Sequence, residues 1–246
     1  SKKIEVERDV KLGNHDNFAV ECAEFIIESG GKRLMDEIKL EKKAVDIYST
    51  KTLSEDQIKL FHENLNVRSS DFIKISLNRL TAHFLKTKME NVVITSKNAV
   101  ESILSNTTSD QLQFKNIYCV GRRTKRLIEQ KIGKVKHAEK NAKKLANYLV
   151  NFIEGTEVTY FCSDLRLDDL PTILKANHIN VNEVEAYSVK FDPEKVDDTA
   201  QGVMFYSPST VKSYLLKNNA NPIAFCIGET TANEARNHFK DVRVAK

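Results

Sequence analysis

The sequence has no tryptophan and contains little proline and glycine. Its 246 residues include only 4 Pro and 8 Gly. Such low Pro and Gly contents exclude collagen-like and low-complexity chains. With 41% hydrophobic and 29% charged residues, the chain has the composition of a globular protein, and it is long enough for one large or two small domains.

Metal, disulfide and nucleotide motifs are also missing. The four cysteines, Cys22, Cys119, Cys162 and Cys226, are far apart and form no C-x-x-C pair, so we expect reduced core thiols rather than a zinc site or a disulfide framework. The six His form no H-x-x-x-H pair, and neither G-x-x-x-x-G-K-[ST] nor G-x-G-x-x-G occurs. The sequence therefore predicts no metal and no cofactor.

Long hydrophobic runs are absent too. The longest apolar stretches, such as residues 223–227, are far shorter than the roughly 20 residues of a membrane-spanning helix. No signal-peptide pattern opens the sequence. We therefore expect a cytoplasmic protein without a membrane partner.

Positive charge is concentrated in one segment. The formal net charge of +4 is too small to indicate a nucleic-acid-binding protein, but residues 122–144 hold ten of the 38 basic residues and only two acidic ones, Glu129 and Glu139. Solvated helix faces are the ordinary explanation of such a segment. The alternative is an electrostatic field that attracts a polyanion.

Short β-rich runs alternate with helical patterns, which predicts an α/β fold built on parallel strands. The expected strands are 45–49, 73–76, 92–95, 117–120, 158–162, 184–187, 203–206 and 223–227, and the expected helices are 54–64, 98–104, 124–131, 141–153, 167–176, 209–216 and 230–238.

Two strand-and-helix patterns occur twice. VVITSKNAVESIL from Val92 resembles VMFYSPSTVKSYL from Val203, and IYCVGRRTKRLIE from Ile117 resembles IAFCIGETTANEA from Ile223. The order and nearly the spacing of both patterns are kept. The sequence therefore predicts two similar domains.

Turns after parallel strands lie at one sheet edge, where helix N-termini present unpaired N–H groups. Gly121 and Gly228 allow close backbone approach there, and hydroxyl donors follow the same strands. These donors are Ser96, Thr124, Ser207, Ser209, Thr230 and Thr231. Each of them alone is more simply a helix cap, but four such turns together favour an anion-binding cleft.

The first 40 residues break this alternation. Ile4, Val6 and residues 10–12 suggest a strand, residues 18–28 an amphipathic helix that stops at the Gly30–Gly31 pair, and residues 32–38 a second short helix. A Lys/Glu-rich stretch follows. We interpret the segment as a short α+β appendage joined by a linker.

From Val45 onward the sequence resembles the uroporphyrinogen-III synthase family. The resemblance rests on VVITSKNAVES, IYCVG, FCSDLRLDDLPTIL with VNEVEAYSV, VMFYSPSTVKS and AFCIGETTANEA, in that order. It implies two α/β domains joined by a two-stranded ladder, the second inserted into the first. The outer domain would be 45–72 and 191–246, the inner domain 79–182, and the ladder 73–78 and 183–190.

Residues 3–39 instead resemble the C-terminal end of porphobilinogen deaminase (hydroxymethylbilane synthase), through NFAVECAEFIIESGGKRLMDEIK. The resemblance implies a fusion of consecutive pathway enzymes. The segment itself would have no deaminase activity, because that enzyme's substrate-binding and cofactor-bearing domains are not in this sequence.

The synthase resemblance implies the cyclisation of hydroxymethylbilane to uroporphyrinogen III. The substrate loses its hydroxyl as water, the resulting azafulvene is attacked at the substituted carbon of the far ring, and a spiro intermediate inverts that ring. Uncatalysed closure gives the uninverted isomer, so the protein must mainly hold one geometry. No nucleophile or cofactor is required.

The eight carboxylates of this substrate suit anion-binding turns and a basic cleft. The expected substrate-binding residues are Ser96, Thr124, Ser163, Leu165 through its backbone, Ser207, Ser209 and Thr230. Two departures weaken individual turns: Arg122 and Arg123 occupy one of them, and Glu229 puts a negative charge in another.

Tyr187 is the candidate for direct chemistry, because the resemblance places a cleft-facing Tyr in EVEAYSV. Its phenol could donate a hydrogen bond or a proton to the departing hydroxyl. A strand Tyr that only packs against a domain is the alternative.

A second function stays open from the residues alone. Duplicated α/β halves equally fit a non-catalytic protein that closes on an anionic small molecule. For the synthase we expect a monomer with hydroxymethylbilane as substrate and no nucleic acid. A deaminase, fused to the chain or associated with it, is the expected protein partner.

Overall fold

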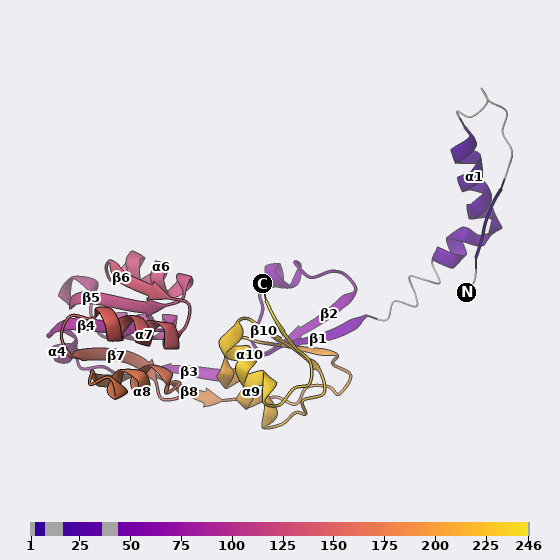
Figure 1. The fold of residues 1–246 in the computed structure, drawn as a ribbon. Coiled ribbons are helices and arrows are strands. Elements are labelled where there is room, and N and C mark those ends of the chain that lie inside the picture. The colour runs from indigo at the N-terminus through magenta and orange to yellow at the C-terminus, as the bar shows by residue number, and fades with distance from the viewer. Residues whose placement is uncertain (1–2, 8–16, 36–43, 246) are drawn as a thin grey trace. The chain divides into compact units, whose positions relative to one another are not determined.

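The computed structural model describes residues 3–7, 17–35 and 44–245 (Figure 1). The chain divides into two compact units, residues 1–47 with 54–68 and residues 48–53 with 69–246. The larger unit contains every residue that the sequence nominates for a site.

The larger unit contains a six-stranded sheet in the order β3-β8-β7-β4-β5-β6. Its strands are β3 (Ile73–Leu77), β4 (Lys88–Ile94), β5 (Gln113–Val120), β6 (Val135–Glu139), β7 (Glu157–Ser163) and β8 (Asn180–Phe191). The strands from β8 to β6 are parallel neighbours, whereas β3 pairs with β8 antiparallel. The sheet is therefore mixed, where the sequence predicted parallel sheets, because the first ladder strand runs against the others.

Helices cover both faces of this sheet. One core packs the sheet against α4 (Ala82–Leu85), α5 (Lys97–Asn106) and α6 (Arg122–Lys131). The other core packs the opposite face against α7 (Ala142–Phe152) and α8 (Asp169–Ala176). A 3₁₀ turn, η2 (Ser109–Gln111), leads into β5. The three-layer arrangement puts the helix N-termini that follow β4, β5, β6 and β7 at the carboxyl edge of the sheet.

A second sheet has the order β11-β10-β9-β1-β2. Its strands are β1 (Val45–Ser49), β2 (Leu65–Ser69), β9 (Gly202–Phe205), β10 (Ile223–Cys226) and β11 (Val242–Val244). β9, β10 and β11 are parallel. Helices α9 (Pro208–Leu215) and α10 (Glu229–Arg236) pack on them around an aromatic core of Phe72, Phe205, Tyr214 and Phe239.

The internal repeat corresponds to equivalent strand-and-helix units. β4–α5 matches β9–α9, and β5–α6 matches β10–α10. In each half the two strands are parallel neighbours. The sequence prediction of two α/β halves is confirmed at this level.

Strand β8 contains a register irregularity opposite the end of β7. Cys162 pairs with Glu185, but the next residue, Ser163, pairs with Tyr187, so Ala186 is an extra residue in β8. Asn78 holds this point from the β3 side, because its backbone N–H donates to the Ala186 carbonyl and its side-chain amide donates to the Glu185 carbonyl. Such a bulge changes the direction in which the next side chains point.

Some predicted elements differ from the structure. Strands β2, β6 and β11 were not predicted, because their half-exposed residues form no apolar run. The expected helix 54–64 is reduced to one turn, α3 (Glu55–Ile58). Ser54 starts it with a capping box, but none of its residues is buried, and so short a helix has no packing to extend it.

The appendage is helical in its described part. Helix α1 (Phe18–Ile26) continues as a π-type turn, η1 (Ile27–Gly31), and residues 32–35 are again helical. Gly30 bends the chain with φ +99° rather than ending it. Ile4 and Val6 lie in a segment without regular structure, so the predicted strand is wrong there, and residues 10–12 and 36–38 lie outside the described residues.

No helix among the described residues is long and apolar enough to cross a membrane.

All four cysteines are free thiols; Cys119, Cys162 and Cys226 are buried and Cys22 is half-buried. Burial raises the pKa of Cys119 and Cys226 to about 11 and that of Cys162 to about 12.

Candidate functional site

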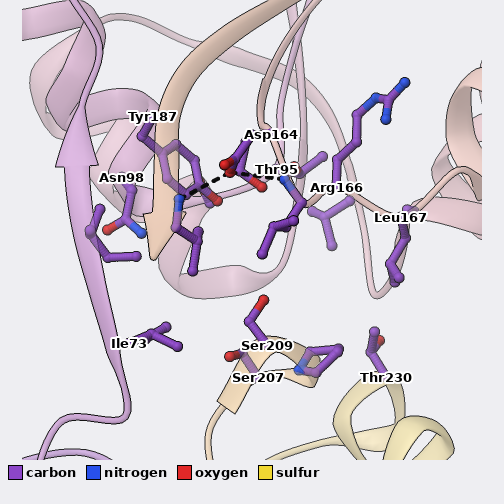
Figure 2. Close-up of a pocket in the computed structure, with 18 of the residues that line it drawn as sticks. Ile73, Thr95, Asn98, Asp164, Arg166, Leu167, Tyr187, Ser207, Ser209 and Thr230 are labelled. Carbon is purple, nitrogen blue, oxygen red and sulfur yellow. Dashed lines mark hydrogen bonds between the residues drawn. The ribbon is translucent and has the colours of Figure 1, made fainter. Parts of the chain in front are cut away.

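A cavity of about 560 Å³ lies where strand ends and helix starts of the larger unit converge. Seven of the eight nominated residues line it: Ser96, Ser163, Leu165, Tyr187, Ser207, Ser209 and Thr230. Figure 2 shows Ser207, Ser209 and Thr230 on one side of the space, with Tyr187 and Asp164 across from them. The volume is within the usual range for small-molecule sites.

Ser96 and Ser207 each cap a helix at the cavity wall. The Ser96 hydroxyl accepts the Ala99 N–H of α5 at 3.2 Å, and the Ser207 hydroxyl accepts the Thr210 N–H of α9 at 3.2 Å. A capping hydroxyl uses its oxygen as an acceptor and keeps its own hydrogen to donate. Both serines therefore cap their helices, and each keeps its hydroxyl hydrogen to donate to an anion in the cavity.

Ser209 and Thr230 lie in the first turns of α9 and α10. The first turn of α9 has no acidic residue, and Pro208 occupies its start. In α10 the first turn contains Glu229, but this carboxylate forms an ion pair with Arg236. The positive ends of both helix dipoles thus face the cavity, and the charge of Glu229 is largely offset.

The turn after β7 uses its own carboxylate. Asp164 Oδ1 accepts the Leu165 N–H at 2.9 Å and the Val189 N–H of β8 at 3.0 Å (Figure 2). Ser163 is buried at the end of β7. The backbone donor expected at Leu165 is therefore already engaged, and what Leu165 presents to the cavity is a side chain that is 44% exposed.

Tyr187 reaches the cavity from β8, directly after the bulge. Its neighbour across the β7 side is Ser163 and its partner across the ladder is Leu77. The ladder also contributes Ile73, Val189 and Phe191 to the lining, so part of the cavity wall formed by the ladder is apolar. Among the described residues, none makes a hydrogen bond to its hydroxyl, so this donor is available to a ligand.

Tyr160 and Asn141 are lining residues that the sequence reasoning missed. Tyr160 lies within β7, its hydroxyl is 3.3 Å from Thr95 Oγ1, and burial raises its pKa to about 12. It is therefore a protonated donor at the cavity wall. A buried strand Tyr gives no sequence signal, but Asn141 caps α7 as Ser96 caps α5 and could have been found by that equivalence.

The charged residues of the cavity balance one another. Its charged lining residues are Asp164, Asp168, Arg166 and Lys212. Arg166 pairs with Glu183 and with Asp168 at 3.2 Å, and the hydrogen bond to Glu183 raises the pKa of Arg166. Its guanidinium points away from the cavity in Figure 2. Lys212 is 3.8 Å from Glu234.

Thr124 is the nominated residue that does not join the others. It is buried in the first turn of α6 and does not line the main cavity. It lines a separate, shallower cavity of about 400 Å³ with Lys97, Arg123, Arg126, Leu127 and Gln130. The Gly121 turn that precedes it has φ +85°, a conformation that favours glycine.

The described residues contain no group of three or more His, Cys, Asp or Glu side chains that could hold a metal ion. The arrangement offers hydroxyl and phenol donors, helix N-termini and an apolar ladder wall. It can bind an anionic organic molecule and hold it in one geometry.

Comparison with known proteins agrees with this fold. Residues 38–246 match the family model described as uroporphyrinogen-III synthase HemD. The solved uroporphyrinogen-III synthetase of Helicobacter pylori superposes with a TM-score of 0.57 at 17% identity, covering 82% of this chain and 92% of that one. A mutant uroporphyrinogen III synthase from the extremely thermophilic bacterium Thermus thermophilus gives 0.61 at 13% identity, covering 81% and 92%. No curated protein sequence matches. Since the family model spans most of the sequence, the chain belongs to the uroporphyrinogen-III synthase family, the cyclising lyases of tetrapyrrole biosynthesis.

Proposed function

We propose that the cavity lined by Ser96, Ser163, Tyr187, Ser207, Ser209 and Thr230 is where this enzyme closes hydroxymethylbilane to uroporphyrinogen III. The observation that carries the proposal is the convergence of these hydroxyl and phenol donors, which are up to 134 positions apart in the sequence (Ser96 to Thr230), on one space.

Different groups of residues bind the carboxylates of the substrate and exclude water. The hydroxyls at the starts of α5, α9 and α10 and the N–H groups of those helices bind peripheral carboxylates of the substrate. The ladder residues Ile73, Val189 and Phe191 exclude water from the reacting carbons. Substrate held in this way closes from a single conformation, and the orientation, more than any proton transfer, selects the inverted isomer.

Tyr187 is proposed as the donor to the leaving hydroxyl. Its phenol hydrogen-bonds the hydroxyl group, which departs as water with the proton of the pyrrole N–H, and the azafulvene forms. The far ring then attacks the azafulvene methylene through its substituted carbon, which gives the spiro intermediate. The bond from that carbon to its original methylene bridge breaks, the bridge carbon bonds to the unsubstituted α-carbon of the same ring, and that α-carbon loses a proton, which replaces the one that left with the water. Asp164 lies opposite the α9 hydroxyls and places a fixed negative charge near the cation that develops.

Product isomer analysis tests the proposal. Hydroxymethylbilane made in situ by a deaminase is offered to the protein, the porphyrinogens are oxidised, and type I and type III isomers are separated by chromatography. We expect type III to exceed type I with the protein and type I alone without it. Type I alone in both would overturn the proposal and favour the alternative function, binding of an anionic small molecule without catalysis.

The domain division is part of the proposal. We assign 45–72 and 191–246 to an outer domain, 79–182 to an inner domain, and 73–78 and 183–190 to the ladder. Support comes from the separate cores around Tyr214 and around Phe161 and from the antiparallel pairing of β3 with β8. Residues 79–182 expressed alone should be folded and should unfold in a single cooperative transition in urea. A chain that is unfolded without urea would contradict the assignment.

We also propose that residues 1–40 are the end of a fused porphobilinogen deaminase, on the resemblance of residues 3–39. The transcript upstream of Ser1 should then encode deaminase sequence in the same reading frame.

We further propose a monomer in the cytoplasm, which light scattering of the purified protein and cell fractionation would test. A dimer in solution, or a protein found only with an organelle, would contradict this.

A further inference from the structure

Three helices beside the cavity begin with positive charge. The first turns hold Lys97 in α5, Arg122 and Arg123 in α6, and Lys143 and Lys144 in α7, and none of these turns has an acidic residue. A helix N-terminus already carries a partial positive charge, so cations there are unfavourable. An anion bound at these starts would remove that repulsion.

The start of α5 and one face of α6, from Arg123 to Gln130, line a basic groove, the cavity of about 400 Å³ described above. Its charged lining consists of Lys97, Arg123 and Arg126, with no carboxylate. All three side chains are exposed, and none of them has an ion pair with a carboxylate of the described residues. The groove is therefore a concentration of uncompensated positive charge.

The main cavity lacks such a surplus. Its two carboxylates, Asp164 and Asp168, balance Arg166 and Lys212, and both cations already contact other acidic residues. A ligand with many carboxylates thus brings more negative charge than this cavity compensates. The basic groove holds a surplus of cations.

The groove and the cavity are neighbours. Ser96 lines the cavity and the next residue, Lys97, lines the groove; Val120 lines the cavity two residues before α6 begins. β4 and β5, which end at these points, are parallel neighbours. The groove therefore begins at the edge of the sheet where the cavity lies.

We propose that the basic groove is an accessory polycarboxylate-binding site, which captures side-chain carboxylates of the tetrapyrrole and leads it into the cavity. The identity of the ligand rests on the proposed function; the anion binding itself does not. Clustered charge at a cleft raises the rate of encounter with an oppositely charged ligand, and salt weakens the effect.

A pair of double variants tests the groove. K97Q/R123Q removes two groove charges, and K131Q/K134Q removes two exposed charges at the far end of α6 and the loop beyond it, so the change in net charge is the same. At low ionic strength we expect kcat/KM for type III formation to fall about tenfold in K97Q/R123Q and less than about twofold in the control, and the difference to shrink as salt increases. Equal effects of the two variants would overturn the proposal.

A binding measurement separates this proposal from the proposed function. Uroporphyrin III, an octacarboxylate that does not react, is titrated against each protein and followed by its fluorescence. We expect weaker binding to K97Q/R123Q than to the control, and weaker binding of the tetracarboxylate coproporphyrin to the wild type. Groove-dependent binding without type III synthesis would refute only the proposed function; type III synthesis with groove-independent binding would refute only the groove.

Folding is checked by thermal unfolding. Because K97Q/R123Q removes cations from helix N-termini, we expect its melting temperature to equal or exceed that of the wild type. A lower melting temperature would give these residues a structural role and would also count against the groove.

Discussion

Ser207 caps a helix and faces a ligand cavity with the same hydroxyl. Its oxygen accepts the Thr210 N–H, and the Thr210 hydroxyl accepts the Ser207 N–H at 3.3 Å. Sequence reasoning could find this residue by the repeat, but it could not separate capping from binding. The structure makes the separation testable, because different substitutions remove the two roles to different extents.

We expect Ser207→Ala to lower the free energy of unfolding by about 1 kcal/mol and Ser207→Gly by only a few tenths, since Gly is tolerated as an N-cap. Both variants lose the hydroxyl donor, so KM for hydroxymethylbilane should rise equally in both. Urea unfolding and steady-state kinetics measure the two effects. A rise in KM that follows stability instead would make Ser207 only a cap.

Tyr187→Phe removes the phenol hydroxyl and leaves the ring, which packs against the core cluster that includes Phe161. General-acid help is worth about 10²- to 10⁴-fold, but an azafulvene can form unaided, so we expect a loss in kcat at or below the low end of that range, with type III still dominant. The isomer ratio and the rate are measured together. An unchanged rate would restrict Tyr187 to packing, and a switch to type I would show that it positions the substrate.

Asp164 is held by two backbone N–H groups, from Leu165 and Val189. In Asp164→Ala both donors lose their partner, and we expect a loss of about 1 to 2 kcal/mol in the free energy of unfolding. Asp164→Asn keeps an acceptor oxygen and should lose clearly less, while losing the negative charge near the substrate. Equal stabilities of the two variants in urea would contradict this account of the turn.

At the scale of single residues, the repeated patterns identified the hydroxyl donors because those residues follow strands in the sequence. Asp164 was part of a quoted turn, yet its use as an internal acceptor depends on β8, which is 25 positions away at Val189. Thr124 matched the pattern but lines the separate groove rather than the main cavity. Such differences depend on tertiary neighbours that sequence spacing does not reveal.

Secondary-structure elements were predicted best where they are buried. β4, β5 and β7 form apolar runs in the middle of the six-stranded sheet, so their sequences alone identify them. β6 is an edge strand of the six-stranded sheet, β11 and β2 are the two edge strands of the other sheet, and their exposed residues resemble loops. The short α3 shows the converse, because a good start signal does not extend a helix that has nothing to pack on.

Strands β4 and β5 are linked by an exposed charge cluster. Glu90 of β4 lies 2.7 Å from both Lys88 and Lys115, and their hydrogen bonds lower the pKa of Glu90 to about 2. A carboxyl whose pKa is lower in the folded protein stabilises the fold above its unfolded pKa. That contribution is lost as the pH falls from about 4.5 through about 2.

We therefore expect the urea midpoint of the wild type to decrease over this pH range more steeply than that of Glu90→Gln, which has no carboxyl to protonate. Added salt should reduce the difference, because the residues are exposed. Measurements at about pH 6, 4 and 3 test the slope. Parallel profiles for the two proteins would show that the cluster contributes nothing measurable.

At the scale of the whole molecule, all cavity-lining residues lie between Ile73 and Thr230, and the family model begins at residue 38. We expect a chain that begins at Glu41 to fold and to form type III product at a rate within about twofold of the full chain, because none of the described residues of the appendage lines the cavity. Circular dichroism and isomer analysis check both parts. A truncated chain that folds but gives only type I would assign the first 40 residues a role in catalysis.

The bulge at Ala186 means that the number of residues before Tyr187, as much as their identity, decides what the cavity contains. Side chains alternate between the two faces of a strand, so removing one residue there would give β7 and β8 a regular register and turn Tyr187 and the following lining residues Val189 and Phe191 to the opposite face. Deleting Ala186 would thus exchange the inner and outer surfaces of the ladder without changing any of these three side chains. Inserting or deleting an odd number of residues in this short stretch changes which side chains face the cavity, whereas an even number leaves the same side chains facing it.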